Sequence, residues 1–80
     1  MNQNKLIMKN YEVWDEGFAT NGNQSTAVYL GVYKAETFVN ACRIAIMAND
    51  WDMNYFDEKN ISYWGCKFYD NEKDARKNFG

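Results

Sequence analysis

Apolar and polar residues alternate along three stretches of the chain, residues 11–18, 26–35 and 61–70. A two-residue period is typical of β-strands, and the second stretch is also rich in the β-branched and aromatic residues that favour strands. In the first stretch both faces carry aromatic side chains, so the pattern leaves its buried face open. In the second stretch the two predicted faces hold Val28, Leu30 and Val32, and Tyr29, Gly31 and Tyr33.

The polar segment 19–25, which reads ATNGNQS, separates the first two predicted strands. Asn21 and Gly22 adopt positive φ angles at low cost, so this segment favours a turn, and we predict a hairpin. The third predicted strand has one face toward a helix and one away from it. These faces hold Trp64, Cys66 and Phe68, and Tyr63, Lys67 and Tyr69.

Residues 36–50 have the spacing of an amphipathic helix, with Thr37 as a suitable N-cap. The predicted apolar stripe comprises Phe38, Ala41, Cys42, Ala45 and Ala48, and it is widened by Ile44, Ile46 and Met47. A helix with so wide an apolar stripe is covered on more than one side. We expect the sheet to cover one side, and either residues 51–56 or a partner chain to cover the other.

The end of the chain predicts a second, short helix after the third strand. Asn71 is suited to cap it, and Asp74 stands in the capping-box position. Glu72 and Arg76 are four residues apart, which favours an ion pair on a helix. The face expected to dock on the domain holds Ala75 and Phe79, with Gly80 where a helix stop belongs.

The predicted order is therefore β-β-α-β-α, in a single α+β domain that spans residues 1–80. The simplest arrangement is a three-stranded sheet with the first strand in the middle and the main helix packed on one face. A right-handed crossover through that helix makes the third strand parallel to the second. Residues 51–60 are predicted to form a loop.

Composition narrows the classes of function. The chain is 46% hydrophobic and 18% aromatic, which predicts a folded core built from large side chains. The formal net charge is −2 and the nine basic residues are scattered, so direct nucleic-acid binding is disfavoured. No apolar run approaches ~20 residues, and the first ten residues are too short and polar for a signal peptide. We therefore expect a cytoplasmic protein without a membrane partner.

The chain contains no histidine, which removes the Ser-His-Asp and Cys-His catalytic systems and most zinc sites. We predict no catalytic residue, no metal site and no cofactor, and hence a protein that is not an enzyme. Cys42 and Cys66 are too few for a disulfide framework. We interpret both as reduced thiols that fill apolar space.

Aromatic residues exceed what one core layer needs. The alternation predicts that Tyr29, Tyr33, Tyr63 and Tyr69 face away from the main helix. They form either a second small core closed by the C-terminal helix or a binding face, where tyrosine and tryptophan are enriched. Because soluble monomers seldom expose large apolar patches, we predict a homo-oligomer with contacts at residues 51–56 and on an exposed face of the helix.

Candidate partner-binding residues come from three places. Asp15 and Glu16 are adjacent acids at the end of the first strand, where solvated side chains are the ordinary expectation and a partner contact is the alternative. Two further candidates, Asn21 and Asn23, lie in the hairpin loop, since exposed loops often bind partners. The loop 51–60 contributes Trp51, Asp52, Tyr55 and Phe56.

Three motifs carry a resemblance over nearly the whole chain: WDEGF at 14–18, YWGC at 63–66 and DNEKDAR at 70–76. With these motifs the chain resembles a group of short uncharacterised proteins from bacteriophages and Firmicutes-type mobile elements. No activity is attached to that group, so the resemblance transfers no site residue. It implies a phage-type accessory protein in the cytoplasm of a host bacterium.

Two functions follow as hypotheses. The first is a non-enzymatic protein that binds and inhibits a host or bacterial defence protein, as phage accessory proteins often do. The second is a small-ligand or nucleotide-binding sponge that sequesters a signalling molecule. The second would require a polar pocket lined by aromatic side chains.

Overall fold

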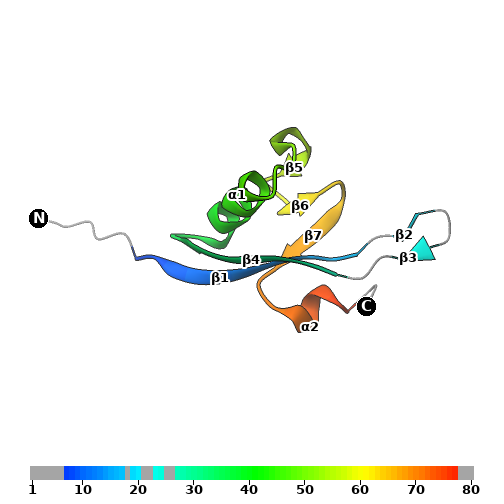
Figure 1. The fold of residues 1–80 in the computed structure, drawn as a ribbon, viewed down its shortest axis with the longest axis horizontal. Coiled ribbons are helices and arrows are strands. Elements are labelled where there is room, and N and C mark those ends of the chain that lie inside the picture. The colour runs from blue at the N-terminus through cyan, green and yellow to red at the C-terminus, as the bar shows by residue number, and fades with distance from the viewer. Residues whose placement is uncertain (1–6, 18, 21–22, 25–26, 78–80) are drawn as a thin grey trace, which may run out of the picture.

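The computed structural model describes residues 7–17, 19–20, 23–24 and 27–77 and confirms an α+β fold. A five-stranded antiparallel sheet has the order β4-β1-β7-β6-β5, and β2 and β3 form a separate two-stranded ribbon (Figure 1). The elements are β1 (Lys9–Asp15), β2 (Ala19–Thr20), β3 (Asn23–Gln24), β4 (Val28–Ala35), α1 (Phe38–Ala48), the 3₁₀ turn η1 (Met53–Tyr55), β5 (Phe56–Asp57), β6 (Ser62–Tyr63), β7 (Cys66–Tyr69) and α2 (Glu72–Ala75).

The predicted place of the first strand is confirmed. β1 lies between β4 and β7 and is antiparallel to both, so β4 and β7 run in the same direction. The predicted three-stranded sheet is wrong, because the sheet has two further strands. The predicted third strand turns back at Trp64 and Gly65 and becomes β6 and β7, and the predicted loop 51–60 contains β5.

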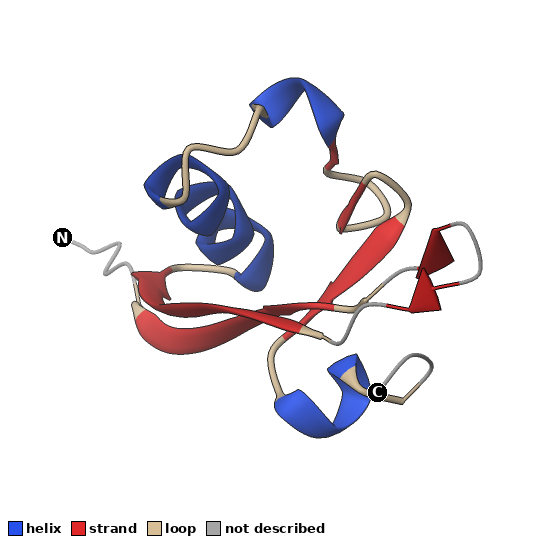
Figure 2. Cartoon of the chain, turned by 45° about the vertical axis from the view of Figure 1, so that its right-hand side comes forward, coloured by secondary structure: helices blue, strands red, loops and turns tan. Residues whose placement is uncertain are grey.

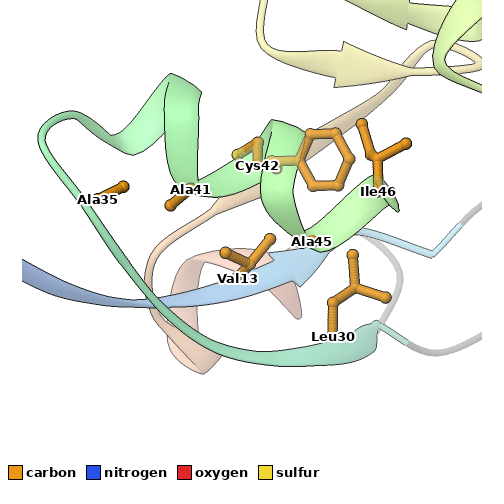
Figure 3. Packing of buried hydrophobic residues seen from close by; sticks show 8 residues of the cluster. Val13, Leu30, Ala35, Ala41, Cys42, Ala45 and Ile46 are labelled. Atoms are coloured by element: carbon orange, nitrogen blue, oxygen red, sulfur yellow. The ribbon is translucent and has the colours of Figure 1, made fainter. Parts of the chain in front are cut away.

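The main helix is confirmed, with Thr37 as its N-cap: the backbone N–H of Asn40 donates to Thr37 Oγ1 at 3.3 Å. Its buried stripe is narrower than predicted, because Met47 and Ala48 are exposed. Small residues in the stripe let α1 approach the sheet closely over Val13 (Figure 3). We call the buried cluster the helix core; it comprises Val13, Leu30, Ala35, Ala41, Cys42, Ala45, Ile46 and Phe68.

A β-bulge changes which side chains of β4 reach the helix core. The register of β1 and β4 shifts where Val13 pairs with Gly31 and Trp14 pairs with Tyr29, so Leu30 is an extra residue. Leu30 and Tyr33 both contact the helix core as a result, although strict alternation puts them on opposite faces. Gly31 has a φ of 116°, a value that side chains rarely allow.

The prediction that four tyrosines face away from α1 is therefore only half right. Tyr33 and Tyr63 pack against the helix core, whereas Tyr69 packs against a second small cluster of Trp14, Ala27 and Ala75. Tyr29 stacks on Trp14 with ring centroids 4.7 Å apart. The predicted second core, closed by the C-terminal helix, is confirmed for this part of the sheet.

The short C-terminal helix has the predicted cap. The backbone N–H of Asp74 donates to Asn71 Oδ1 at 2.8 Å, and Arg76 pairs with Glu72 at 2.7 Å. Ala75 is fully buried, while Phe79 and Gly80 lie outside the described residues. α1 and α2 lie on opposite sides of the sheet (Figure 2). Among the residues that the structure describes, no helix has the length and apolar character needed to span a membrane.

Candidate binding surface

Four aromatic side chains form a continuous series from the helix core to the solvent. Trp51 stacks on Tyr63 with centroids 4.7 Å apart, Tyr55 meets the edge of Tyr63 at 6.2 Å, and Trp64 stacks on Tyr55 at 4.7 Å. Trp51 and Tyr63 pack against the helix core, whereas Tyr55 is 49% exposed and Trp64 is 69% exposed. We call Trp51, Tyr55, Tyr63 and Trp64 the aromatic surface.

The end of α1 fixes Trp51. The N–H of Asp50 donates to the carbonyl of Met47 at 3.2 Å, and the N–H of Trp51 donates to that of Ile46 at 2.9 Å. With Asp50 left-handed at a φ of 59°, these bonds form a Schellman motif. A hydrophobic contact usually accompanies this motif, and here Trp51 packs against the helix core to which Ile46 belongs.

Asp52 fixes the next part of the aromatic surface. Its Oδ1 accepts the N–H of Asn54 at 2.9 Å and caps η1, and its carbonyl accepts the N–H of Tyr55 at 3.2 Å. The N–H of Asp52 donates to the Tyr63 hydroxyl at 3.0 Å. Because Asp52 bonds to both Tyr55 and Tyr63, two of the four rings are held by one short segment.

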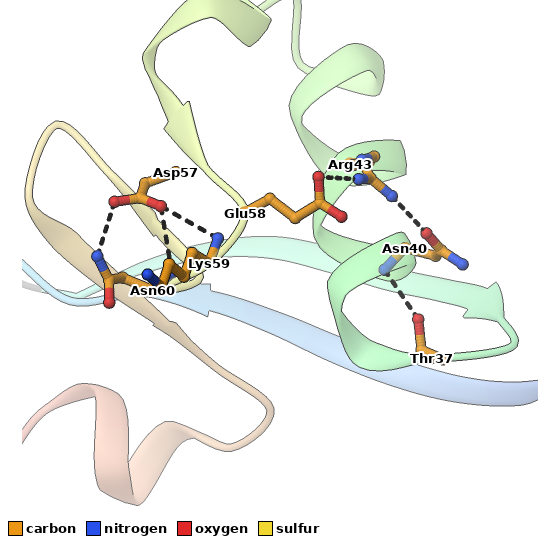
Figure 4. Close-up of polar contacts among 7 residues, drawn as sticks. All are labelled: Thr37, Asn40, Arg43, Asp57, Glu58, Lys59 and Asn60. Atoms are coloured by element: carbon orange, nitrogen blue, oxygen red, sulfur yellow. Dashed lines mark hydrogen bonds and ion pairs between the residues drawn. The ribbon is translucent and has the colours of Figure 1, made fainter.

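Polar contacts order the turn between β5 and β6, and one ion pair joins this turn to α1 (Figure 4). Asp57 Oδ1 accepts the N–H of Lys59 at 3.1 Å and that of Asn60 at 3.2 Å, and Asn60 Nδ2 donates to Asp57 Oδ2 at 2.8 Å. The bonds from Asn60 lower the pKa of Asp57, which therefore stays ionised. Glu58 pairs with Arg43 of α1, and Arg43 also donates to Asn40 at 2.7 Å.

Trp64 combines a strained backbone with an exposed side chain. Its φ is 54° and that of Gly65 is 79°, so the two residues form a tight turn of the kind that normally carries Asn-Gly. A left-handed conformation costs an ordinary residue ~1 kcal/mol or more. The prediction that Trp64 faces the helix is wrong, because the turn directs its side chain toward the solvent.

The structure places the predicted partner-binding residues in several different environments. Trp51, Asp52 and Tyr55 of the predicted loop come together at the aromatic surface. Phe56 does not join them, because it packs against Phe68 of the helix core at 5.8 Å. Asn21 lies outside the described residues, and Asn23 belongs to β3 of the separate ribbon.

Sequence reasoning missed Trp64 as a surface residue. The available signal was Gly65, which follows it directly and interrupts an otherwise alternating strand pattern. Such a glycine marks a bulge or a turn.

The expectation that Asp15 and Glu16 are solvated is wrong, because they are 7% and 9% exposed. Glu16 joins β1 to β7: its Oε2 accepts the N–H of Lys67 at 2.9 Å, and its own N–H donates to the Lys67 carbonyl at 2.9 Å. Asp15 Oδ1 accepts no hydrogen bond from any described residue. Burial, and then the neighbouring Glu16 carboxylate, raise the pKa of Asp15 to about 8.

Both cysteines are free and buried, as predicted. Burial raises the pKa of Cys42 to about 12 and that of Cys66 to about 11, with smaller contributions from Asp15 to each. Their thiols stay protonated at neutral pH and are weak nucleophiles.

A shallow groove of about 370 Å³ lies along the outer side of α1. It is lined by apolar side chains (Met8, Ala35, Ile44 and Met47) and by polar or charged ones (Lys34, Glu36, Asn40 and Arg43), and none of the described residues that line it is aromatic. The groove therefore differs from the aromatic-lined polar pocket that a nucleotide-binding sponge requires.

No protein-family model matches the chain, and the searches of curated proteins and of solved structures found no match either.

Proposed function

We propose that the chain is a non-enzymatic binding protein that docks its aromatic surface on another protein. The observation that carries this proposal is Trp64: its left-handed backbone is strained and its side chain is 69% exposed. Neither property stabilises the fold. Strained residues that the fold does not need are concentrated at functional sites.

The arrangement of the rings supports a protein partner. Tryptophan and tyrosine dominate the residues that contribute most to protein–protein binding, because they bury a large area with few rotatable bonds. The hydrogen bonds of Asp52 and the Schellman motif at Trp51 fix the rings before binding. A preorganised surface loses less conformational entropy on association.

We propose further that the partner is a host or bacterial defence protein and that binding inhibits it. The resemblance to short phage and mobile-element proteins supports this partner class. The exposed carboxylates of Asp50, Asp52 and Asp57 disfavour the alternative, a nucleotide sponge, since they repel phosphate groups.

The test is affinity capture from a bacterial lysate with three immobilised proteins: the wild type, Trp64→Asn and Val32→Ala. Asn is an ordinary residue at a left-handed turn position, so Trp64→Asn keeps the fold while it removes the ring. Val32 is 52% exposed on β4 and serves as the matched apolar control. We expect a protein that the wild type and Val32→Ala capture and that Trp64→Asn does not.

Mass spectrometry of the bound fraction identifies that protein, and an assay of its activity tests inhibition. Equal capture by the wild type and Trp64→Asn would show that the aromatic surface is not the binding site. A thermal-shift screen with nucleotides examines the alternative, because a ligand at 100 times its Kd stabilises by ~2.7 kcal/mol.

The predicted homo-oligomer stays a prediction. Ile44 and Met47 of α1 are 36% and 60% exposed, and they supply apolar area of the kind that it needs. Light scattering at micromolar concentration checks it. A mass that remains at 9.4 kDa after tenfold concentration would rule the oligomer out.

A further inference from the structure

The aromatic surface lies in the most acidic part of the chain. Residues 50–64 contain four carboxylates, at Asp50, Asp52, Asp57 and Glu58, and one lysine, Lys59. Among the described residues, only Glu58 of the four forms an ion pair, with Arg43. Asp50 and Asp52 directly flank Trp51, so two exposed negative charges border the rings.

Asp52 is an exposed acid that is tied to the aromatic surface. Its N–H donates to the Tyr63 hydroxyl and its carbonyl accepts the backbone N–H of Tyr55. Its Oδ1 accepts the N–H of Asn54, and its Oδ2 accepts no hydrogen bond from the described residues. A carboxylate fixed by one oxygen and open at the other is suited to pair with a guanidinium group.

The faces of the exposed rings favour the same ligand. Aromatic faces carry negative potential and attract cations, most often the planar guanidinium of arginine. The protein uses this contact elsewhere: the Arg76 guanidinium lies 5.7 Å from the Trp14 ring, and the Lys9 ammonium lies 5.9 Å from the Tyr11 ring. Tyr55 and Trp64 present an exposed ring pair, whereas Trp14 is buried.

The same charges argue against two other occupants. A second copy whose two-fold axis passed through the aromatic surface would bring Asp50 and Asp52 of the two copies close together, and like charges across an interface are unfavourable. A nucleic acid would bring phosphates to the same carboxylates. A partner with positive charge is complementary to the aromatic surface and to the carboxylates that border it.

We infer that the aromatic surface recognises an arginine side chain on the partner, with the guanidinium stacked on the outer face of Trp64, which packs on Tyr55, and paired with the Asp52 carboxylate. This inference rests on the proposed function, since it specifies what the docking surface contacts. It names a partner protein that presents arginine on an exposed loop or extended segment.

A synthetic peptide tests the inference without the natural partner. The probe is a peptide of alternating glycine and arginine, and the matched peptide has citrulline, the neutral isostere, in place of arginine. Two-dimensional NMR follows the indole N–H resonances of the protein during each titration. We expect the arginine peptide to shift the Trp64 indole signal, with an affinity that falls as salt rises to about 0.5 M.

Three variants assign the contact. Trp64→Asn and Asp52→Asn should each weaken binding of the arginine peptide by about tenfold or more, whereas Glu36→Gln, an exposed acid before α1, should leave it unchanged. Circular dichroism confirms that each variant is folded. Equal binding of the citrulline peptide, or no binding of the arginine peptide, would overturn the inference.

The two proposals fail separately. If a captured protein depends on Trp64 but not on Asp52, the binding function stands and arginine recognition is wrong. If the arginine peptide binds as expected but no protein is captured through Trp64, the chemistry of the surface stands and the proposed function loses its support.

Discussion

The helix core and the aromatic surface meet at Trp51 and use their large side chains in different ways. In the helix core, Val13 and Ile46 are completely buried. On the aromatic surface the exposed fraction rises from Trp51 to Trp64, although these rings could bury more area than any aliphatic side chain. Trp51 and Tyr63 still pack against the helix core, so the difference singles out Tyr55 and Trp64 as the large side chains that contribute little to stability in the free chain.

Two residues with almost the same backbone make the comparison sharper. Ile61 and Trp64 are both left-handed, with φ angles of 51° and 54°. Ile61 packs against the helix core, so burial of its side chain offsets the strain. Trp64 contacts only a Tyr55 ring that is itself 49% exposed among the described aromatic residues, so burial offsets much less of its strain and its exposed ring requires another explanation.

The largest expected effect on the free energy of unfolding comes from a substitution in the helix core. Ile46→Ala should lower the free energy of unfolding by ~3 kcal/mol, because it removes buried apolar atoms and leaves a cavity beneath α1. Urea denaturation followed by circular dichroism measures this loss. Met47→Ala, one residue away at a 60% exposed position, is the control and should change stability by less than ~0.5 kcal/mol. Similar losses for both would contradict the assignment of the core.

The next largest effect is the pH dependence of stability that arises from Asp15. The pKa of Asp15 is raised in the folded chain, so the folded state binds more protons than the unfolded state between pH 4 and pH 8. The contribution of protonated Asp15 to stability should therefore be fully present near pH 4 and should be lost as pH rises through about 8. We expect a decrease of ~2 kcal/mol, less than the full shift would give, because local opening around Asp15 lets water reach the ionised carboxylate.

Urea midpoints of the wild type and Asp15→Asn at pH 5 and pH 8 measure this dependence. The variant should be less sensitive to pH and should exceed the wild type in stability at pH 8. Parallel pH profiles for the two proteins would show that Asp15 does not titrate in this range.

A smaller effect is expected at the start of α1. Thr37→Ala removes the acceptor for the Asn40 N–H and should cost ~1 kcal/mol. Thr37→Ser keeps the acceptor and should lie within a few tenths of a kcal/mol of the wild type. Thermal denaturation monitored by circular dichroism distinguishes them, and an equal loss in both variants would point to the threonine methyl group instead of the cap.

The smallest expected effect on stability is that of Trp64→Asn, and it distinguishes the aromatic surface from the helix core. Trp64→Asn should change stability by less than ~1 kcal/mol, because relief of the left-handed strain offsets the lost contact with the Tyr55 ring. Ile61→Asn has the same backbone preference but removes a side chain that packs against the helix core, so it should destabilise the protein. Differential scanning calorimetry measures both. A clear loss of stability in Trp64→Asn would mean that its ring supports the fold.

Elements with local signals were predictable from the sequence. α1 and α2 each begin at a side chain that bonds to the backbone three residues later, Thr37 and Asn71, and this chemistry needs no tertiary contact. The central place of β1 followed from connection rules. The turn at Trp64 was missed because tryptophan has high strand propensity and an alternating pattern surrounds it.

Two features depend on contacts between distant segments and could not be predicted. Leu30 and Tyr33 reach the same face only because β1 and β4 change register at the bulge. Asp15 and Glu16 are buried because β7, some fifty residues later, pairs with the end of β1. The aromatic surface was predictable in part, through Trp51, Asp52 and Tyr55, whose residues are adjacent in the chain.

β1 pairs much more extensively with β4 than with β7, and this difference predicts which part of the sheet opens first. β1 pairs with β4 along its whole length but with β7 only through Trp14 and Asp15, supplemented by the bonds between Glu16 and Lys67. The half of the sheet that carries β5, β6 and β7 can therefore separate from β1 at lower free energy than the hairpin of β1 and β4 can unzip. In native-state hydrogen exchange, we expect the amides of β6 and β7 to exchange through such sub-global openings. The amides of β1 and β4 should exchange only when the whole domain unfolds.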